Sequence, residues 1–214
     1  MRTKKAIINT MTSIIAEIVS IVCGLILPRL ILGAFGSSYN GITSSITQFL
    51  SCIVLLRAGV GSVTRAALYN PLAQKDRNEI SGIVNATAIF MKKVALIYVG
   101  ALLVFACIYP LFVRDSFDWI FSATLVLIIG SSTFVDNYFG IAYQMLLQAD
   151  QKNYINTIPQ IITTILNTIV AAILIHCGAD IHFVKLGSAL VYFIRPLFLY
   201  YYVKKKYKIN SSVT

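Results

Sequence analysis

The sequence predicts an all-α polytopic membrane protein with six transmembrane helices. Three observations support this fold class: 57% of the 214 residues are apolar, only 12% are charged, and apolar stretches recur along the whole chain. A soluble domain usually carries about 25% charged residues, so this composition excludes a water-soluble globule. At roughly 30–40 residues for each spanning helix and its connection, the chain has room for about six.

The N-terminal half contains three predicted spans, at residues 7–32, 41–69 and 80–113. The first follows a basic N-terminus, but its apolar run continues past Ile26 without a cleavage site, so we expect a retained helix and not a signal peptide. The second begins after a turn rich in Gly and Ser and stops at Asn70-Pro71. The third opens with an amphipathic stretch at 79–93, which we expect at the membrane interface, and continues as an apolar run.

The C-terminal half contains the other three predicted spans, at residues 119–147, 155–176 and 183–202. Trp119 and the tyrosines at 200–202 stand where aromatic side chains meet the membrane surface. Residues 1–203 then form one six-helix lobe, and residues 204–214 form a basic cytoplasmic tail.

The basic residues predict the orientation. Most of the 18 Lys and Arg fall in connections on the side of the N-terminus, whereas Arg114 and Lys185 fall on the other side. Basic residues concentrate in cytoplasmic connections, so both termini are predicted to be cytoplasmic. The net charge of +10 is explained by this bias and by contact with anionic phospholipid headgroups, so no nucleic-acid partner is expected.

No pattern indicates catalysis or a cofactor. The four cysteines stand singly, without the spacing of a zinc site or a disulfide framework. There is no G-x-S-x-G motif and no P-loop, so we expect neither an enzyme nor direct use of ATP. No metal site is expected.

Charged residues inside the predicted spans are the candidates for function, because a charge in the hydrocarbon costs about 2.5–3.5 kcal/mol on insertion scales. These residues are Glu17, Arg29, Arg57, Asp136 and Arg195. The two acids are interpreted either as ion-pair partners of Arg57 and Arg195 or as a proton or sodium site that couples transport.

The second predicted span carries a possible anion track. Arg57, Gly61 and Arg65 stand at i, i+4 and i+8, which places them on neighbouring faces over ~12 Å of helix. The glycine leaves the face between two guanidinium groups open, and such a pair could hold a diphosphate. Alternatively, the arginines lie at the inner membrane surface and the glycine allows close helix packing.

Three stretches carry a family resemblance: LPRLILG at 27–33 followed by YNG at 39–41, LYNPLA at 68–73, and LLQADQKNY at 146–154. On these residues the chain resembles the N-terminal lobe of the polysaccharide-biosynthesis flippases, the O-antigen and teichoic-acid exporter type within the multidrug and oligosaccharidyl-lipid exporter superfamily. The resemblance implies a bacterial inner-membrane protein that turns an undecaprenyl-diphosphate-linked oligosaccharide to the outer leaflet by alternating access. It implies that Arg29, Arg57, Arg65 and Arg195 line a cavity for the diphosphate.

The family typically has two such lobes, so the resemblance also implies a second lobe, a homodimer, or a truncated fragment. Two other functions stay open. A multidrug-type extruder would have aromatic residues on the cavity wall, and Asp136 or Glu17 would titrate there. A non-transporting scaffold or inactive product would have paired charges and no open cavity.

Overall fold

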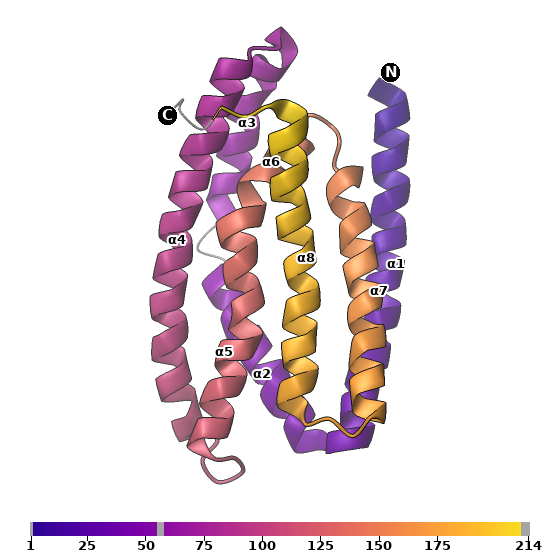
Figure 1. Ribbon diagram of the computed structural model, residues 1–214, viewed down its shortest axis with the longest axis vertical. Coiled ribbons are helices and arrows are strands. Elements are labelled where there is room, and N and C mark those ends of the chain that lie inside the picture. The colour runs from indigo at the N-terminus through magenta and orange to yellow at the C-terminus, as the bar shows by residue number, and fades with distance from the viewer. Residues whose placement is uncertain (1, 55–57, 211–214) are drawn as a thin grey trace.

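The computed structural model of the protein describes residues 2–54 and 58–210. Every regular element in this part of the chain is helical (Figure 1). The elements are α1 (Arg2–Phe35), α2 (Ser37–Val54), α3 (Ala58–Gln74), α4 (Arg77–Phe112), α5 (Trp119–Val135), the π-helical turn η2 (Asp136–Gly140), α6 (Ile141–Ala149), α7 (Tyr154–His176) and α8 (Ile181–Tyr207).

Five helical segments in the described residues are long and apolar enough to cross a membrane: Thr3–Phe35, Arg77–Phe112, Trp119–Ala149, Tyr154–His176 and Ile181–Tyr207. They agree in position with five of the six predicted spans. The chain runs up and down along one axis, so that both termini and the connections after α3 and α6 lie at the same end (Figure 1). The described part of the chain is therefore all-helical and agrees with the predicted all-α membrane protein.

The remaining predicted span, residues 41–69, overlaps two described helices. Its first part is α2 and its second part is α3, and residues 55–57 lie outside the described part. α2 packs on α5, and α3 packs on α6, which continues the line of α5 through η2. The two short helices thus follow the two halves of the long segment Trp119–Ala149.

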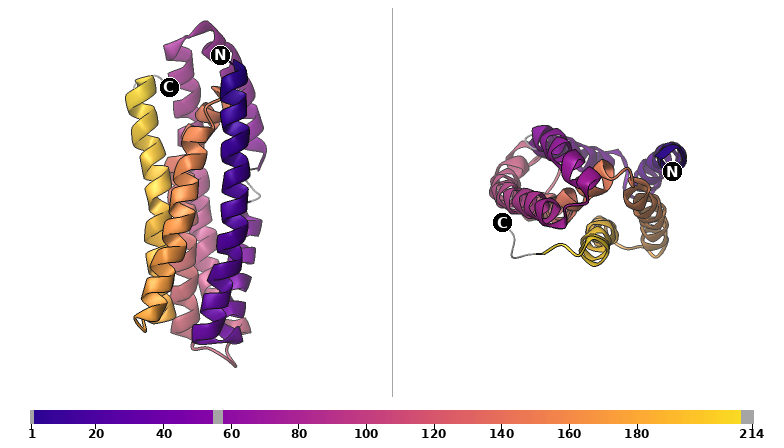
Figure 2. Two further views of the ribbon diagram at one scale, coloured as in Figure 1. Left: turned by 90° about the vertical axis from the view of Figure 1, so that its right-hand side faces the viewer. Right: turned by 90° about the horizontal axis from the view of Figure 1, so that it is seen from above.

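The core is divided into two main apolar clusters along the bundle axis. The lower cluster joins α2, α4 and α5 through residues such as Ile46, Leu102 and Leu125. The upper cluster joins α3, α4, α6 and α8 through residues such as Leu68, Leu147 and Leu199. Because α1 and α7 contribute to neither cluster's fully buried set, they are held differently: α1 packs chiefly on α7, and α7 packs on α1 and α8 (Figure 2).

Two observed boundaries differ in detail from the predicted ones. The amphipathic stretch at 79–93 is part of α4, which runs without a break from Arg77 to Phe112 and whose first turn is capped by the Asp76 side chain. The end of α8 extends into the predicted tail at 204–214, because the helix continues to Tyr207 with its lysines in the last turn. Cations are favourable there, since the last turn of a helix exposes carbonyl oxygens.

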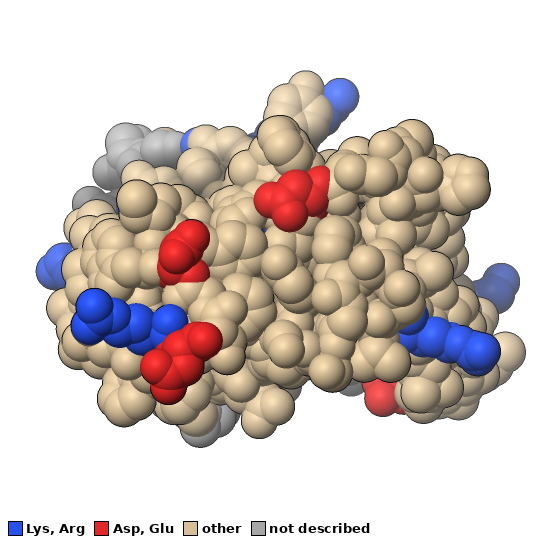
Figure 3. Space-filling model, turned by 90° about the horizontal axis from the view of Figure 1, so that it is seen from below, with Lys and Arg blue, Asp and Glu red and all other residues tan. Residues whose placement is uncertain are grey.

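The two ends of the bundle differ in charge. The end that carries the termini holds most of the lysines, including Lys4, Lys5, Lys75 and Lys152. The opposite end carries short connections at 113–118 and 177–180, in which the charged residues are Arg114, Asp115, Asp118 and Asp180. Charged side chains at that end are few, and most of the surface there is uncharged (Figure 3).

Candidate functional site: a polar groove along α1, α7 and α8

Two helices present rows of polar residues on one face although they are otherwise apolar. In α7 the row consists of Asn156, Gln160, Thr163 and Asn167. In α8 it consists of Lys185, Ser188, Tyr192 and Arg195. Successive members stand three or four residues apart, which keeps each row on one side of its helix.

Helix α1 completes the polar surface. From Thr10 to Gly24 its residues divide into three faces: a half-buried face against α7, an exposed apolar face, and a row formed by Thr10, Ser13, Glu17, Ser20 and Gly24. At 100° per residue this row lies beside the face that contacts α7. The upper part of the row borders a shallow hollow, and Ser20 and Gly24 face α7 and α8.

Two adjoining cavities lie where these rows meet, and together they form the polar groove. The first, about 310 Å³, is lined from α2, α5 and α8 by hydroxyl groups, by Lys185 and by Asn167. The second, about 320 Å³, is lined from α1, α7 and α8 and includes Arg195. Both linings contain Leu27, Asn167 and Tyr192, so the cavities adjoin one another. The described lining residues of the groove include two cations and no carboxylate.

Among the predicted arginines that the structure describes, Arg195 is the one that lies in the groove. Its Nε and Nη2 atoms donate to Oδ1 of Asn156 at 3.2 and 3.0 Å. The side chain is half-buried and lies next to Pro196, which is buried in the middle of α8. Asn156 therefore orients the guanidinium group from the neighbouring helix.

Lys185 and Asn167 are residues of the groove that the sequence-based search for charges missed. The sequence predicted Lys185 on the outer side of the membrane, near the start of the span at 183–202. In the structure it is half-buried in the lining of the groove. The signal that could have found both residues is the helical spacing of Asn, Thr and Ser in α7 and α8.

Arg65 does not belong to the groove. Its Nη1 donates to Oε1 of Gln148 at 2.6 Å, which joins α3 to α6. The open face predicted at Gly61 is wrong as well, because a Cβ atom there would stand 3.3 Å from Cε of Met145. The glycine allows close packing of α3 on α6, which was the alternative interpretation of this position.

The other two predicted arginines are Arg57 and Arg29. Arg57 lies outside the described residues. Arg29 is exposed on α1 and lies in neither lining of the groove. Among the described arginines, Arg29 and Arg65 therefore do not share a site with Arg195.

The two predicted acids lie in different surroundings. Glu17 is exposed on the polar row of α1, and no described residue forms an ion pair or hydrogen bond with it. Of the interpretations left open for Glu17, an ion pair with Arg195 is therefore not formed. Asp136 is half-buried at the start of η2, where its Oδ1 accepts a hydrogen bond from Nε2 of Gln144 at 2.9 Å.

The π-helical turn brings α5 and α6 close to α8. A Cβ atom on Gly140 would stand 2.7 Å from Oδ1 of Asp136 and 3.1 Å from Cβ of Pro196. Only glycine fits this approach without a shift of its neighbours. Single π-turns inside α-helices are frequent at functional sites, and this one lies between the two apolar clusters.

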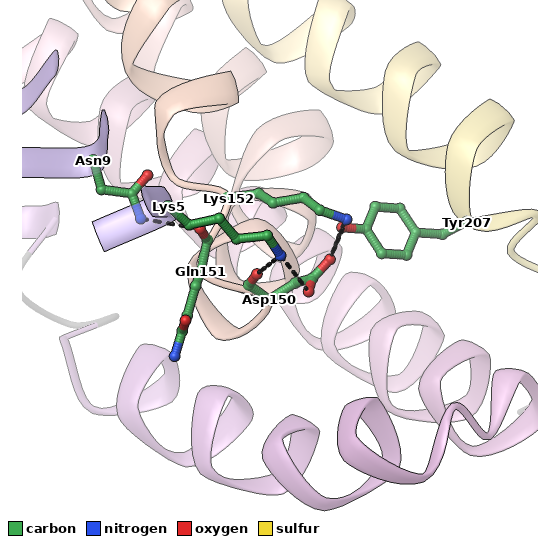
Figure 4. A network of polar contacts seen from close by, with 6 residues as sticks. All are labelled: Lys5, Asn9, Asp150, Gln151, Lys152 and Tyr207. Carbon is green, nitrogen blue, oxygen red and sulfur yellow. Dashed lines mark hydrogen bonds and ion pairs between the residues drawn. The ribbon is translucent and has the colours of Figure 1, made fainter. Parts of the chain in front are cut away.

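A second polar cluster ties three elements together at the end that carries the termini (Figure 4). The Asp150 carboxylate accepts a hydrogen bond from the Tyr207 hydroxyl at 2.5 Å and pairs with Lys152 at 2.5 Å. Lys5 approaches the same carboxylate at 3.8 Å, and Asn9 bonds to the backbone of Gln151 and Tyr154. The connection after α6 therefore holds the start of α1 and the end of α8.

The described residues contain no group of His, Cys, Asp and Glu side chains that could hold a metal ion. Comparison with protein-family models, with curated proteins and with solved structures finds no match. The fold and the groove define the class of the chain as a helical membrane protein with a polar surface between its helices.

Proposed function

We propose that the chain is one lobe of a bacterial inner-membrane transporter that moves an undecaprenyl-diphosphate-linked oligosaccharide from the cytoplasmic to the outer leaflet by alternating access. The observation that carries this proposal is the polar groove, with two cations and no carboxylate among its described lining residues. Water-lined surfaces with one sign of charge attract ligands of the opposite sign. A diphosphate with a hydroxylated glycan matches both the charge and the polarity.

Arg195 is proposed to bind the diphosphate. Its planar guanidinium group suits phosphate oxygens, and Asn156 restricts its orientation. By the rise of 1.5 Å per residue, Arg195 lies ~21 Å along α8 from Ile181, within the ~30 Å of a hydrocarbon core. The groove thus gives a charged headgroup a polar environment at membrane depth.

The orientation in this proposal has both termini in the cytoplasm, since the lysine-rich end carries them. α2 and α3 together are proposed as the sixth span. The polar row of α1 with Glu17 is proposed to face the transport path, where a second lobe or a second copy of the chain covers it. Hydrocarbon alone would leave its hydroxyl and carboxyl groups without partners.

Features of the groove favour this substrate over a drug-like cation. Among the described lining residues Tyr192 is the only aromatic side chain, whereas an extruder of apolar drugs is expected to have an aromatic wall. An inert scaffold is disfavoured because Lys185 has no described partner and faces a cavity.

Equilibrium binding to the purified full chain tests the proposal. The probes are farnesyl-diphosphate-linked N-acetylglucosamine and the same compound without the diphosphate. Arg195→Gln should lower the affinity for the diphosphate probe about tenfold or more, because a charge-assisted hydrogen bond is worth about 1.5–3 kcal/mol. Lys93→Gln, a change of an exposed cation on α4, is the matched control and should bind normally. Equal binding of the two probes by the unmodified chain would overturn the proposal.

Translocation itself is tested in proteoliposomes. The unmodified chain should accelerate the exchange of fluorescent undecaprenyl-diphosphate-linked N-acetylglucosamine between leaflets, and Arg195→Gln should slow it. Exchange at the rate of protein-free vesicles, despite normal binding, would mean that the lobe binds this substrate without transporting it.

A further inference from the structure

The lower part of the groove contains a cation without a counter-charge. Lys185 lines the 310 Å³ cavity, and no residue in the described part of the chain accepts a hydrogen bond from its ammonium group or forms an ion pair with it. A buried charge is unfavourable unless it is paired and hydrogen-bonded. The site is therefore suited to a ligand that brings a negative charge.

In the part of the chain that the structure describes, Asn167 lacks a hydrogen-bond donor for its side-chain oxygen, whereas Lys185 lacks an acceptor. The side chain is only 3% exposed, and its Oδ1 atom is buried without a hydrogen-bond donor among the described residues. Its Nδ2 donates to the Tyr192 hydroxyl at 3.2 Å, which fixes the orientation of the amide. Asn167 and Lys185 belong to the lining of the same cavity.

The hydroxyl groups around Lys185 can also accept hydrogen bonds from a ligand. Ser132 and Ser188 each donate their proton to a carbonyl of their own helix at 3.1 Å, and Thr47 does so at 2.8 Å. Their oxygen atoms keep lone pairs that can face the cavity. This part of the groove thus offers several acceptors and one cationic donor.

A ligand that fits must carry several hydroxyl donors and one anionic group. We infer that the Lys185–Asn167 part of the groove is a subsite for an acidic sugar, with the sugar carboxylate at Nζ of Lys185 and a sugar hydroxyl at Oδ1 of Asn167. This inference rests on the proposed function and specifies the glycan of its substrate as one that contains a uronic acid or another carboxylated sugar.

The subsite is separate from the diphosphate position. Lys185 and Arg195 are ten residues apart on α8, which is ~15 Å along the helix. A single diphosphate does not bridge that distance, whereas the glycan extends away from the diphosphate. One ammonium group also suits a monoanion, since phosphate sites usually provide several donors from Arg or backbone groups.

A matched pair of probes tests the inference on the purified full chain. Both are farnesyl-diphosphate-linked disaccharides with N-acetylglucosamine first, and the second sugar is glucuronic acid in one and glucose in the other. The unmodified chain should bind the glucuronic acid probe about tenfold more tightly, the value of one charge-assisted hydrogen bond. Equal affinities for the two probes would overturn the inference and leave the proposed function intact, whereas failure to bind either probe would overturn both.

Three variants separate specificity from damage to the fold. Lys185→Met should remove the preference for glucuronic acid and keep the affinity for the glucose probe, and Lys185→Arg should retain the preference. Arg195→Gln should weaken both probes by the same factor. A uniform loss of affinity in Lys185→Met, with an unchanged unfolding midpoint, would show that Lys185 binds the diphosphate and would contradict the acidic-sugar subsite.

Discussion

The Tyr207 hydroxyl at the end of α8 donates a hydrogen bond of 2.5 Å to the Asp150 carboxylate in the connection before α7. The same carboxylate pairs with Lys152 and is approached by Lys5 from α1. Gln151 has a positive φ of 55°, which turns the chain sharply between the two residues that flank it. One short connection therefore fixes the relative positions of α1 and α8, the two outer walls of the polar groove.

Replacing Asp150 should loosen this end of the bundle. Asp150→Asn keeps the shape of the side chain but removes the charge, and it should destabilise the protein by about 1 kcal/mol, since the group is partly exposed and its ion pairs are partly screened. Thermal unfolding in detergent should show a lower midpoint, and Tyr207→Phe should lower it as well, because it removes the hydroxyl that donates to Asp150 and accepts from Lys152. Asp115→Asn, in the connection at the other end, should leave the midpoint unchanged; an equal fall in both variants would argue against the contact network.

The π-helical turn should not tolerate a larger side chain at Gly140. In Gly140→Ala the new Cβ would meet Asp136 and Pro196, so α8 must shift away, at a cost of about 1–3 kcal/mol. Gly100→Ala in α4 is the control, because nothing lies within 4 Å of its Cβ position. That variant should be neutral or stabilised by up to ~1 kcal/mol from helix propensity. Comparable unfolding midpoints for the two variants would contradict the close approach of η2 to α8.

Arg65 should stabilise the fold without contributing to substrate binding. Arg65→Gln loses the hydrogen bond to Gln148 that joins α3 and α6, so the unfolding midpoint should fall. Its affinity for farnesyl-diphosphate-linked N-acetylglucosamine should equal that of the unmodified chain, whereas Arg195→Gln should bind weakly. A loss of affinity in Arg65→Gln as large as that in Arg195→Gln would restore the arginine track predicted from the sequence.

The fold class and five spans could be predicted because hydropathy and length act locally. Trp119–Ala149 and Tyr154–His176 agree with their predicted ranges to within a few residues. The described parts of the predicted span at 41–69 are α2 and α3, and residues 55–57 between them lie outside the described part. The amphipathic stretch at 79–93 and the apolar run after it form the single helix α4, in agreement with the predicted span at 80–113.

The candidate site was predicted only in part. The prediction depended on single charged residues within the spans, because a charge in the hydrocarbon is costly. Arg195 is one of these residues. Asn167 was not predicted, because a single neutral polar residue costs little free energy in the membrane. The polar surface forms only where α1, α7 and α8 bring three polar rows together. The partners of Glu17 and Asp136 depend on which helices are neighbours. The spacing of residues within one helix does not determine those neighbours.

The central claim is that the groove is a water-accessible, cationic surface at membrane depth. Ser188 and Leu190 test it as a matched pair, because both lie on α8 near the same depth but Ser188 lines the groove while Leu190 is exposed on the apolar outside. Each is replaced by Cys in a chain whose four native cysteines are changed to Ala, and membrane vesicles are treated with an anionic sulfonatoethyl or a cationic trimethylammonioethyl methanethiosulfonate. The account predicts that Ser188→Cys reacts, faster with the anionic reagent, and that Leu190→Cys does not react; reaction of neither cysteine, or faster reaction of Ser188→Cys with the cationic reagent, would contradict it.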